Sequence, residues 1–155
     1  MWNRKHSVTL STVVCFIFVA ILTAGLFLGP WVVKMWFTLY RGWSEDGEAM
    51  GNMLTLFCAC FYPCAFFGYV TLYSLLRMLF HIQKDEIFIF ANVQYLRRIS
   101  WCCFAVALIT FVGGVFYIPF FFVAVAAAFV GLMLRVVKNV MESAVAIKEE
   151  NELTI

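Results

Sequence analysis

The sequence predicts an all-α, polytopic membrane protein with four transmembrane helices, the fourth of which extends into the cytosol. Apolar residues make up 65% of the 155 residues and the mean hydropathy is +0.94, whereas soluble domains contain about 45–50% apolar residues. Charged residues make up 13%, about half the usual share. The apolar residues gather in four runs that are long enough to cross a bilayer, and at this length we expect a single domain, residues 1–155.

The first span is predicted over about residues 8–28, behind a short basic segment. Its apolar length of roughly 21 residues exceeds the 7–15 residues of a signal-peptide core, so we expect the segment to be retained. Gly25 and Gly29 lie four residues apart, a pattern that lets another helix approach closely. Gly29-Pro30 is expected to end the span. Residues 31–43, rich in Trp and Tyr, are expected to lie along the outer interface.

The second span is predicted over about residues 53–80, which at 1.5 Å per residue is longer than the hydrocarbon core. Pro63 supplies a kink, because it removes a backbone donor. An inner loop follows, in which residues 87–99 mix apolar and polar side chains. This pattern indicates an interfacial helix that bends into the third span, at about 101–118. Gly113-Gly114 is expected to loosen the outer half of that span.

The fourth span is predicted over about residues 120–136, with Pro119 in its first turn. No helix breaker separates this span from residues 137–155, which we interpret as a cytosolic continuation of the same helix. Small residues recur four apart along the span and predict close packing against another helix: Ala124 with Ala128, and Ala127 with Gly131.

Basic residues are distributed unevenly over the connections, and this predicts that both termini lie in the cytosol. The outer segments hold only Lys34 and Arg41 of the 11 Lys and Arg residues. Because cytoplasmic loops carry an excess of Lys and Arg, we expect a multi-pass protein with a cytosolic tail. The remaining basic residues lie in the segments placed inside: Arg4, Lys5, Arg77, Lys84, Arg97, Arg98, Arg135, Lys138 and Lys148.

Cysteine and histidine give little support for redox or metal chemistry. The six Cys residues lie in or beside apolar runs, where Cys behaves as a small apolar residue, so we predict no disulfide framework. Cys58, Cys60 and Cys64 share the second span but lack the C-x-x-C spacing of a redox pair, and a membrane thiol oxidoreductase is the third hypothesis. His6 and His81 are placed at the same face, but a stable zinc site needs three or four ligands.

Ionisable side chains are missing from the middle of every predicted span, which disfavours a proton-coupled or ion-coupled transporter. No Ser/His/Asp set, phosphate-binding loop or H-E-x-x-H pattern is present. The sequence therefore favours a non-enzymatic protein without a cofactor, and the net charge of +2 does not indicate direct nucleic-acid binding. The alternative is a small transport or export component, a channel-like bundle for a neutral or apolar solute, lined by Phe61, Phe66, Tyr69 and Tyr73.

The predicted tail is amphipathic, with charged and polar residues mostly opposite an apolar stripe. The extreme end is acidic, so anionic lipid repels it and the stripe needs a protein surface. That surface is residues 87–99 of the same chain, a second copy of the chain, or another protein; packing within the chain is the simplest of the three. The stripe consists of Val137, Val140, Met141, Ala144, Val145 and the stem of Lys148.

The segments FANVQYLRRIS, at residues 90–100, and IKEENELTI, at residues 147–155, resemble a family of small four-span bacterial membrane proteins of unknown function, found mostly in Gram-positive bacteria. Its members share an asparagine-valine, leucine-arginine lead-in to the third span. Their C-terminus usually reads glutamate-glutamate-asparagine-aspartate-leucine-threonine, where this chain has Glu152 in place of the aspartate. The resemblance implies the bacterial cytoplasmic membrane and a gene that often neighbours one for a helix-turn-helix regulator. It implies no reaction.

The leading hypothesis is a regulatory or adaptor subunit that docks a partner through its cytosolic face. Besides the lipid bilayer, the candidate partners are a helix-turn-helix regulator, a further membrane subunit and a second copy of the chain. The docking face is predicted to consist of Asn92, Leu96, Arg97, Arg98, Glu142, Val145, Lys148, Glu149, Glu150, Asn151, Glu152, Leu153 and Thr154.

Overall fold

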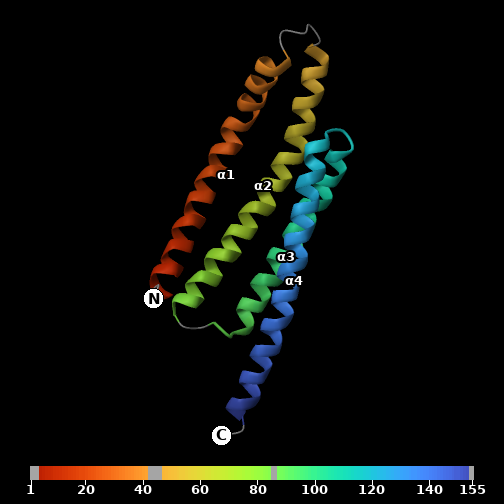
Figure 1. Ribbon diagram of the computed structural model, residues 1–155. Coiled ribbons are helices and arrows are strands. Elements are labelled where there is room, and N and C mark those ends of the chain that lie inside the picture. Colours follow the sequence, from red (N-terminus) through yellow and green to blue (C-terminus); the bar gives the residue numbers. More distant parts are fainter. Residues whose placement is uncertain (1–3, 42–46, 85–86, 154–155) are drawn as a thin grey trace.

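The computed structural model describes residues 4–41, 47–84 and 87–153. Within them four helices follow one another, as Figure 1 shows: α1 (Arg4–Arg41), α2 (Gly47–Gln83), α3 (Phe90–Gly114) and α4 (Ile118–Leu153). Each helix contains a stretch that is long and apolar enough to cross a membrane. These residues contain no strand. The prediction of an all-α, four-span protein with a long fourth helix is confirmed.

The helices form an open bundle in which each one packs against the next in sequence. The contact between α3 and α4 is the most extensive, and within the described residues the backbones of α1 and α4 stay apart. The end where α1 and α3 begin and α2 and α4 finish is called the terminal end, and the opposite end the turn end (Figure 1). Large apolar side chains stay exposed, Phe27 by 81% and Leu108 by 67%. In a bilayer this surface faces lipid.

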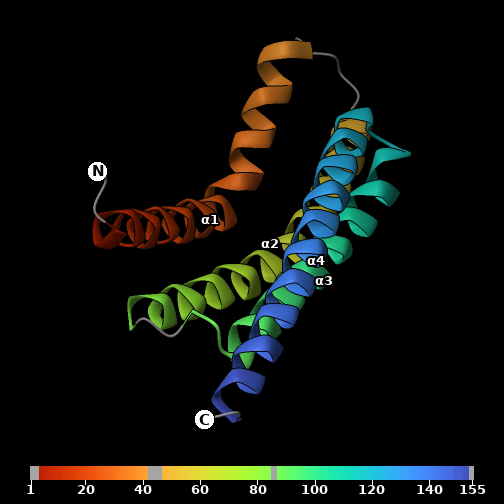
Figure 2. The same cartoon turned by 60° about the horizontal axis from the view of Figure 1, so that its bottom comes forward.

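The first helix does not end at Gly29-Pro30 as the sequence analysis expected, but continues to Arg41. Pro30 lies inside α1, where its ring removes a backbone hydrogen bond. Figure 2 shows that α1 changes direction along its length, and proline is a common cause of such a kink. Trp31 and Trp36 are therefore helical residues, because the apolar segment after Pro30 contains no second breaker. Trp43 lies outside the described residues.

Two small residues let α2 approach α1 closely, as their spacing predicted. A Cβ atom on Gly25 would lie 3.3 Å from Cζ of Phe61, and one on Gly29 would lie 3.7 Å from Cε1 of the same ring. Two residues before Gly25, the hydroxyl groups of Thr23 and Tyr69 form a 2.8 Å hydrogen bond between the two helices. The ring and this bond fix the register of α1 on α2.

The third helix is uninterrupted from Phe90 to Gly114, so the bend expected between residues 87–99 and the third span is not seen. Its buried residues recur along one face from Asn92 to Gly113. Leu96 and Ile99 are only 4% and 3% exposed. The start of α3 therefore packs against protein rather than lying along a membrane surface, which is why it stays collinear with the span.

Gly113 and Gly114 end α3 and begin a turn over residues 115–117. A Cβ atom on Gly113 would lie 2.8 Å from Sγ of Cys60, and one on Gly114 would lie 3.0 Å from the backbone nitrogen of Phe121. The observed role of the two glycines is thus the close approach of α2, α3 and α4. The helix ends at Gly114, one turn earlier than the predicted end of the third span.

The fourth helix packs on α3 through its small residues. Ala124 is 3% exposed, and a Cβ atom on Gly131 would lie 3.3 Å from Cβ of Cys103. The hydroxyl of Ser100 donates a buried 2.9 Å hydrogen bond to the carbonyl of Gly131. The predicted packing of the small residues of α4 against another helix is confirmed. With 36 residues, α4 is about 54 Å long, well beyond the ~30 Å hydrocarbon core.

Candidate functional site

The predicted docking residues of α3 divide into two pairs. Asn92 and Leu96 are buried, at 1% and 4% exposure, and the Asn92 amide donates a 2.8 Å hydrogen bond to the carbonyl of Ile87. These two side chains stabilise the start of α3. Arg97 and Arg98 are exposed, so they are the members of the set on α3 that are open to a ligand.

Val140 and Val145 lie at opposite edges of the predicted apolar stripe of α4, and Ile147, which was not part of that prediction, lies beside Val140. Val145 is 4% exposed, and α3 is the helix that packs against α4, so this side of α4 is covered from within the chain. Val140 and Ile147 are 64% and 59% exposed. At 100° per residue they lie about 140–160° around the helix from Val145. Packing within the chain therefore accounts for only one of the two apolar sides.

The remaining predicted docking residues lie at the end of α4. Lys148, Glu149, Glu150 and Asn151 are exposed helical residues. Glu152 and Leu153 belong to the helix, and their side chains, together with Thr154, lie outside the described residues. Figure 1 shows that this part of α4 extends past the start of α3.

A polar groove lies between α3 and α4 near the terminal end and joins two regions of the predicted docking face. It measures about 450 Å³. Arg97 lines it from α3 and Glu142 from α4. The other lining residues are Ser100, Trp101, Arg135, Lys138 and Asn139.

The charged groups of the groove differ in their partners. Lys138 forms an ion pair with Glu142 one turn along α4, whereas no carboxylate of the described residues is paired with Arg97 or Arg135. The guanidinium of Arg135 lies 5.3 Å from the centre of the Trp101 ring, a cation–π distance. Three cations and one carboxylate give this groove a net charge of +2. Sequence reasoning singled out Arg97 and Glu142 but missed the pairing of Arg135 with Trp101.

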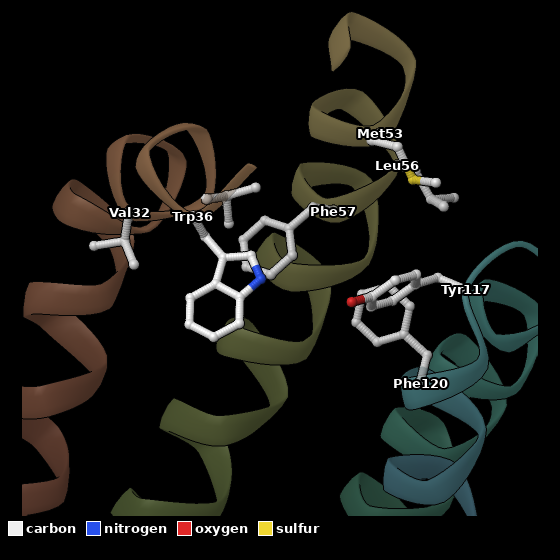
Figure 3. Close-up of a pocket in the computed structure, with 8 residues that line it drawn as sticks. Val32, Trp36, Met53, Leu56, Phe57, Tyr117 and Phe120 are labelled. Atoms are coloured by element: carbon white, nitrogen blue, oxygen red, sulfur yellow. The ribbon is translucent and has the colours of Figure 1, made fainter. Parts of the chain in front are cut away.

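A second cavity, of about 310 Å³, lies at the turn end between α1, α2 and α4. Figure 3 shows Trp36, Phe57 and Phe120 around this space, each on a different helix. Phe57 stacks on Phe120, with ring centres 6.5 Å apart. The wall is apolar apart from the polar atoms of Trp36 and Tyr117; its other lining residues are Val32, Val33, Met53 and Leu56.

The four aromatic residues predicted to line a solute route in the second span do not line this cavity. Phe61 stacks on Phe57 with ring centres 5.3 Å apart, and Phe66 is 65% exposed. Tyr69 bonds to Thr23 on α1. Tyr73 is 54% exposed and accepts a 3.0 Å hydrogen bond from Arg77. Phe66, Tyr69 and Tyr73 lie within about 60° of one another around α2, whereas Phe61 lies toward Gly25 and Gly29 of α1.

The six cysteines are free. Cys60 is buried toward Gly113 of α3, whereas Cys58 lines a shallow hollow on α2 itself, beside Pro63. Cys58 and Cys60 therefore face different surroundings. In the described part of the chain, no group of three or more His, Cys, Asp and Glu side chains could hold a metal ion.

Four helices that are long and apolar enough to cross a bilayer, with apolar side chains exposed around them, define an integral, multi-pass membrane protein. More particularly, the chain belongs to the family described as "Protein of unknown function (DUF2975)", whose model matches residues 5–155. Comparison with curated proteins and comparison with solved structures gave no match.

Proposed function

We propose that this membrane protein is a non-enzymatic regulatory or adaptor subunit that docks a protein partner through the projecting part of α4. The observation that carries the proposal is the second apolar stripe of α4, which holds Val136, Val140 and Ile147. These three side chains are 63%, 64% and 59% exposed, and nothing in the described residues covers them.

The length of α4 takes the end of this stripe, at Ile147, out of the bilayer, while Val136 stays at hydrocarbon depth. From Ile118, one hydrocarbon thickness of ~30 Å is used up after about 20 residues, at Lys138. Val140 and Ile147 then lie about 3 Å and 14 Å beyond that level. Val140 lies in the headgroup layer, whereas Ile147 lies beyond it in water, so a protein surface that covers Ile147 gains its transfer free energy.

The charges beside the stripe indicate which partner fits it. Lys148 lies about 100° to one side of Ile147 and Glu150 about 60° to the other side. In a parallel pair of identical helices, one side of the first helix faces the opposite side of the second. Lys148 of one copy then faces Glu150 of the other. Two copies inserted with the same orientation run parallel, so a second copy of the chain is the partner that we propose.

Site-specific photo-cross-linking in membranes tests this proposal. A cross-linking residue at Val140 should give an adduct of twice the chain mass, and the same residue at Glu149 should not. Glu149 is exposed and lies about 180° from Val140. Removal of residues 147–155 should abolish the adduct. No adduct, or equal adducts at the two positions, would refute docking through this stripe. An adduct of another mass would mean that the partner is another protein and not a second copy of the chain.

The proposed location is the bacterial cytoplasmic membrane with both termini in the cytosol. Its support is the excess of Lys and Arg in the connections at the terminal end. A tag fused after Ile155 should be inaccessible to a membrane-impermeant reagent in intact cells and accessible after lysis. Labelling in intact cells would reverse the orientation and place the docking stripe outside.

The turn-end cavity supports a second candidate function, the binding of a neutral or apolar solute in a transport or export step. Its volume of about 310 Å³ is at the lower end of the ligand-pocket range. Leu56→Trp should fill the cavity and abolish the binding of an apolar fluorescent dye. The matched change Phe66→Trp, on the exposed side of α2, should not. Equal dye binding by both variants would exclude the cavity as the site.

A further inference from the structure

We propose that the groove between α3 and α4 binds the phosphate headgroup of an anionic phospholipid. The groove has a net charge of +2, and its lining includes Arg97 and Arg135, which are not paired with any carboxylate of the described residues. Guanidinium groups donate several hydrogen bonds in a fork that matches phosphate oxygens. This site is distinct from the stripe proposed for protein docking.

The spacing along the helices places the groove at headgroup depth. Arg97 is 17 residues from the turn-end limit of α3 at Gly114, since 114 − 97 = 17. Arg135 is 17 residues from the turn-end limit of α4 at Ile118, since 135 − 118 = 17. Both Cα atoms therefore lie about 26 Å from the turn, close to one hydrocarbon thickness. Two cations at equal depth, on neighbouring helices, face the layer of lipid phosphates.

The surroundings of the two arginines suit a lipid better than a soluble anion. Trp101 lies one turn of α3 from Arg97 toward the bilayer centre and is 56% exposed, and Leu132 has the same exposure beside Arg135 on α4. A lipid whose phosphate enters the groove can lay its acyl chains along these two side chains. Arg135 is held over the Trp101 ring, so its charge is positioned before the lipid arrives.

Glu142 allows a test in which a substitution should strengthen lipid binding rather than weaken it. Its carboxylate pairs with Lys138 and would repel an incoming phosphate. Glu142→Gln removes this repulsion and releases the Lys138 ammonium for the ligand. A variant that only disturbed the packing of α4 would not strengthen lipid binding.

The experiment is a titration of the full chain in detergent with phosphatidylglycerol or phosphatidylcholine, followed by native mass spectrometry. Wild-type protein should bind phosphatidylglycerol at least tenfold more tightly. At roughly fivefold per cation, Arg97→Gln with Arg135→Gln should weaken that binding on the order of 20-fold. Glu142→Gln should strengthen it severalfold. Lys84→Gln, at an exposed lysine outside both the groove and the predicted docking face, should change it less than twofold.

Several outcomes overturn the proposal. They are equal binding of the two lipids, an equal loss in the Lys84 variant, and weaker binding by Glu142→Gln. Inorganic phosphate provides a further arm: if it binds as tightly as phosphatidylglycerol, the ligand is a soluble anion and the lipid assignment falls. The cross-linking of Val140 does not depend on these outcomes, so the lipid site and the docking stripe can fail separately.

Discussion

Gly113→Ala is the substitution for which the structure gives the sharpest stability prediction. The added Cβ would lie 2.8 Å from Sγ of Cys60 and 3.2 Å from Cδ2 of Phe120, on two other helices. Overpacking of a close contact of this kind costs about 1–3 kcal/mol. Replacement of glycine by alanine within a helix returns up to ~1 kcal/mol. We therefore expect a net loss of about 1 kcal/mol in the free energy of unfolding.

A matched control separates the two contributions. Gly51 also lies near a helix end, in α2, and a Cβ atom there would meet nothing within 4 Å. Gly51→Ala should therefore show the helical gain without the overpacking. The difference between the two variants, about 2 kcal/mol, measures the contact of α3 with its neighbours.

The assay is reversible unfolding in mixed micelles, followed by circular dichroism, with each variant also made in a Cys60→Ala background. Removal of the Cys60 sulfur makes room for the new methyl group, so the cost of Gly113→Ala should fall by at least half, as coupling between residues in contact predicts. Two results would show that α2 and α3 do not approach closely at this glycine. One is equal stability of Gly113→Ala and Gly51→Ala. The other is an unchanged loss in the free energy of unfolding for Gly113→Ala in the Cys60→Ala background.

Three further predictions concern single bonds between or within helices. Ser100→Ala removes the buried bond to the Gly131 carbonyl and should cost about 0.5–1.5 kcal/mol in the same unfolding assay; no loss would show that the bond is not made. Thr23→Val removes the bond to Tyr69 and should lower the free energy of unfolding by about 0.6 kcal/mol, a loss that a Tyr69→Phe background should abolish. Pro30→Ala restores a backbone donor inside α1 and should straighten that helix, which spin-label distances across α1 would report as a longer separation; an unchanged distance would assign the bend to another cause.

The fold was predictable because a bilayer demands long apolar helices, and apolar runs of that length are visible in a single sequence. The close approaches at Gly25 and Gly131 followed from small residues four apart. The predicted end of the first span at Gly29-Pro30 is wrong, because α1 continues through Pro30 to Arg41. In a long apolar helix the lost bond at Pro30 costs less than a new helix end, which would leave several backbone groups unpaired in lipid.

The polar groove could not be predicted because it depends on the register of α4 against α3. Sequence analysis placed the end of the third span at residue 118, whereas α3 ends at Gly114. An error of four residues is one helical turn, about 6 Å, and it moves Arg97 away from the level of Arg135. The turn-end cavity was even less predictable, because its wall combines Trp36, Phe57 and Phe120 from three helices. No sequence pattern within one helix shows that these side chains lie together.

The packing of the bundle is uneven, because α1 has fewer buried residues than α3. This difference bears on how the turn-end cavity would open. In the most apolar 18-residue stretch of α1 no residue is buried, whereas 39% of the residues in the most apolar 18-residue stretch of α3 are buried. Among the described helices α1 packs only against α2, where the ring of Phe61 lies over Gly25 and Gly29. An element with so few buried contacts separates from the rest at the lowest free energy. Since α1 also forms one wall of the turn-end cavity, its displacement from α2 is the movement that would open that cavity, while α3 and α4 keep the groove in place.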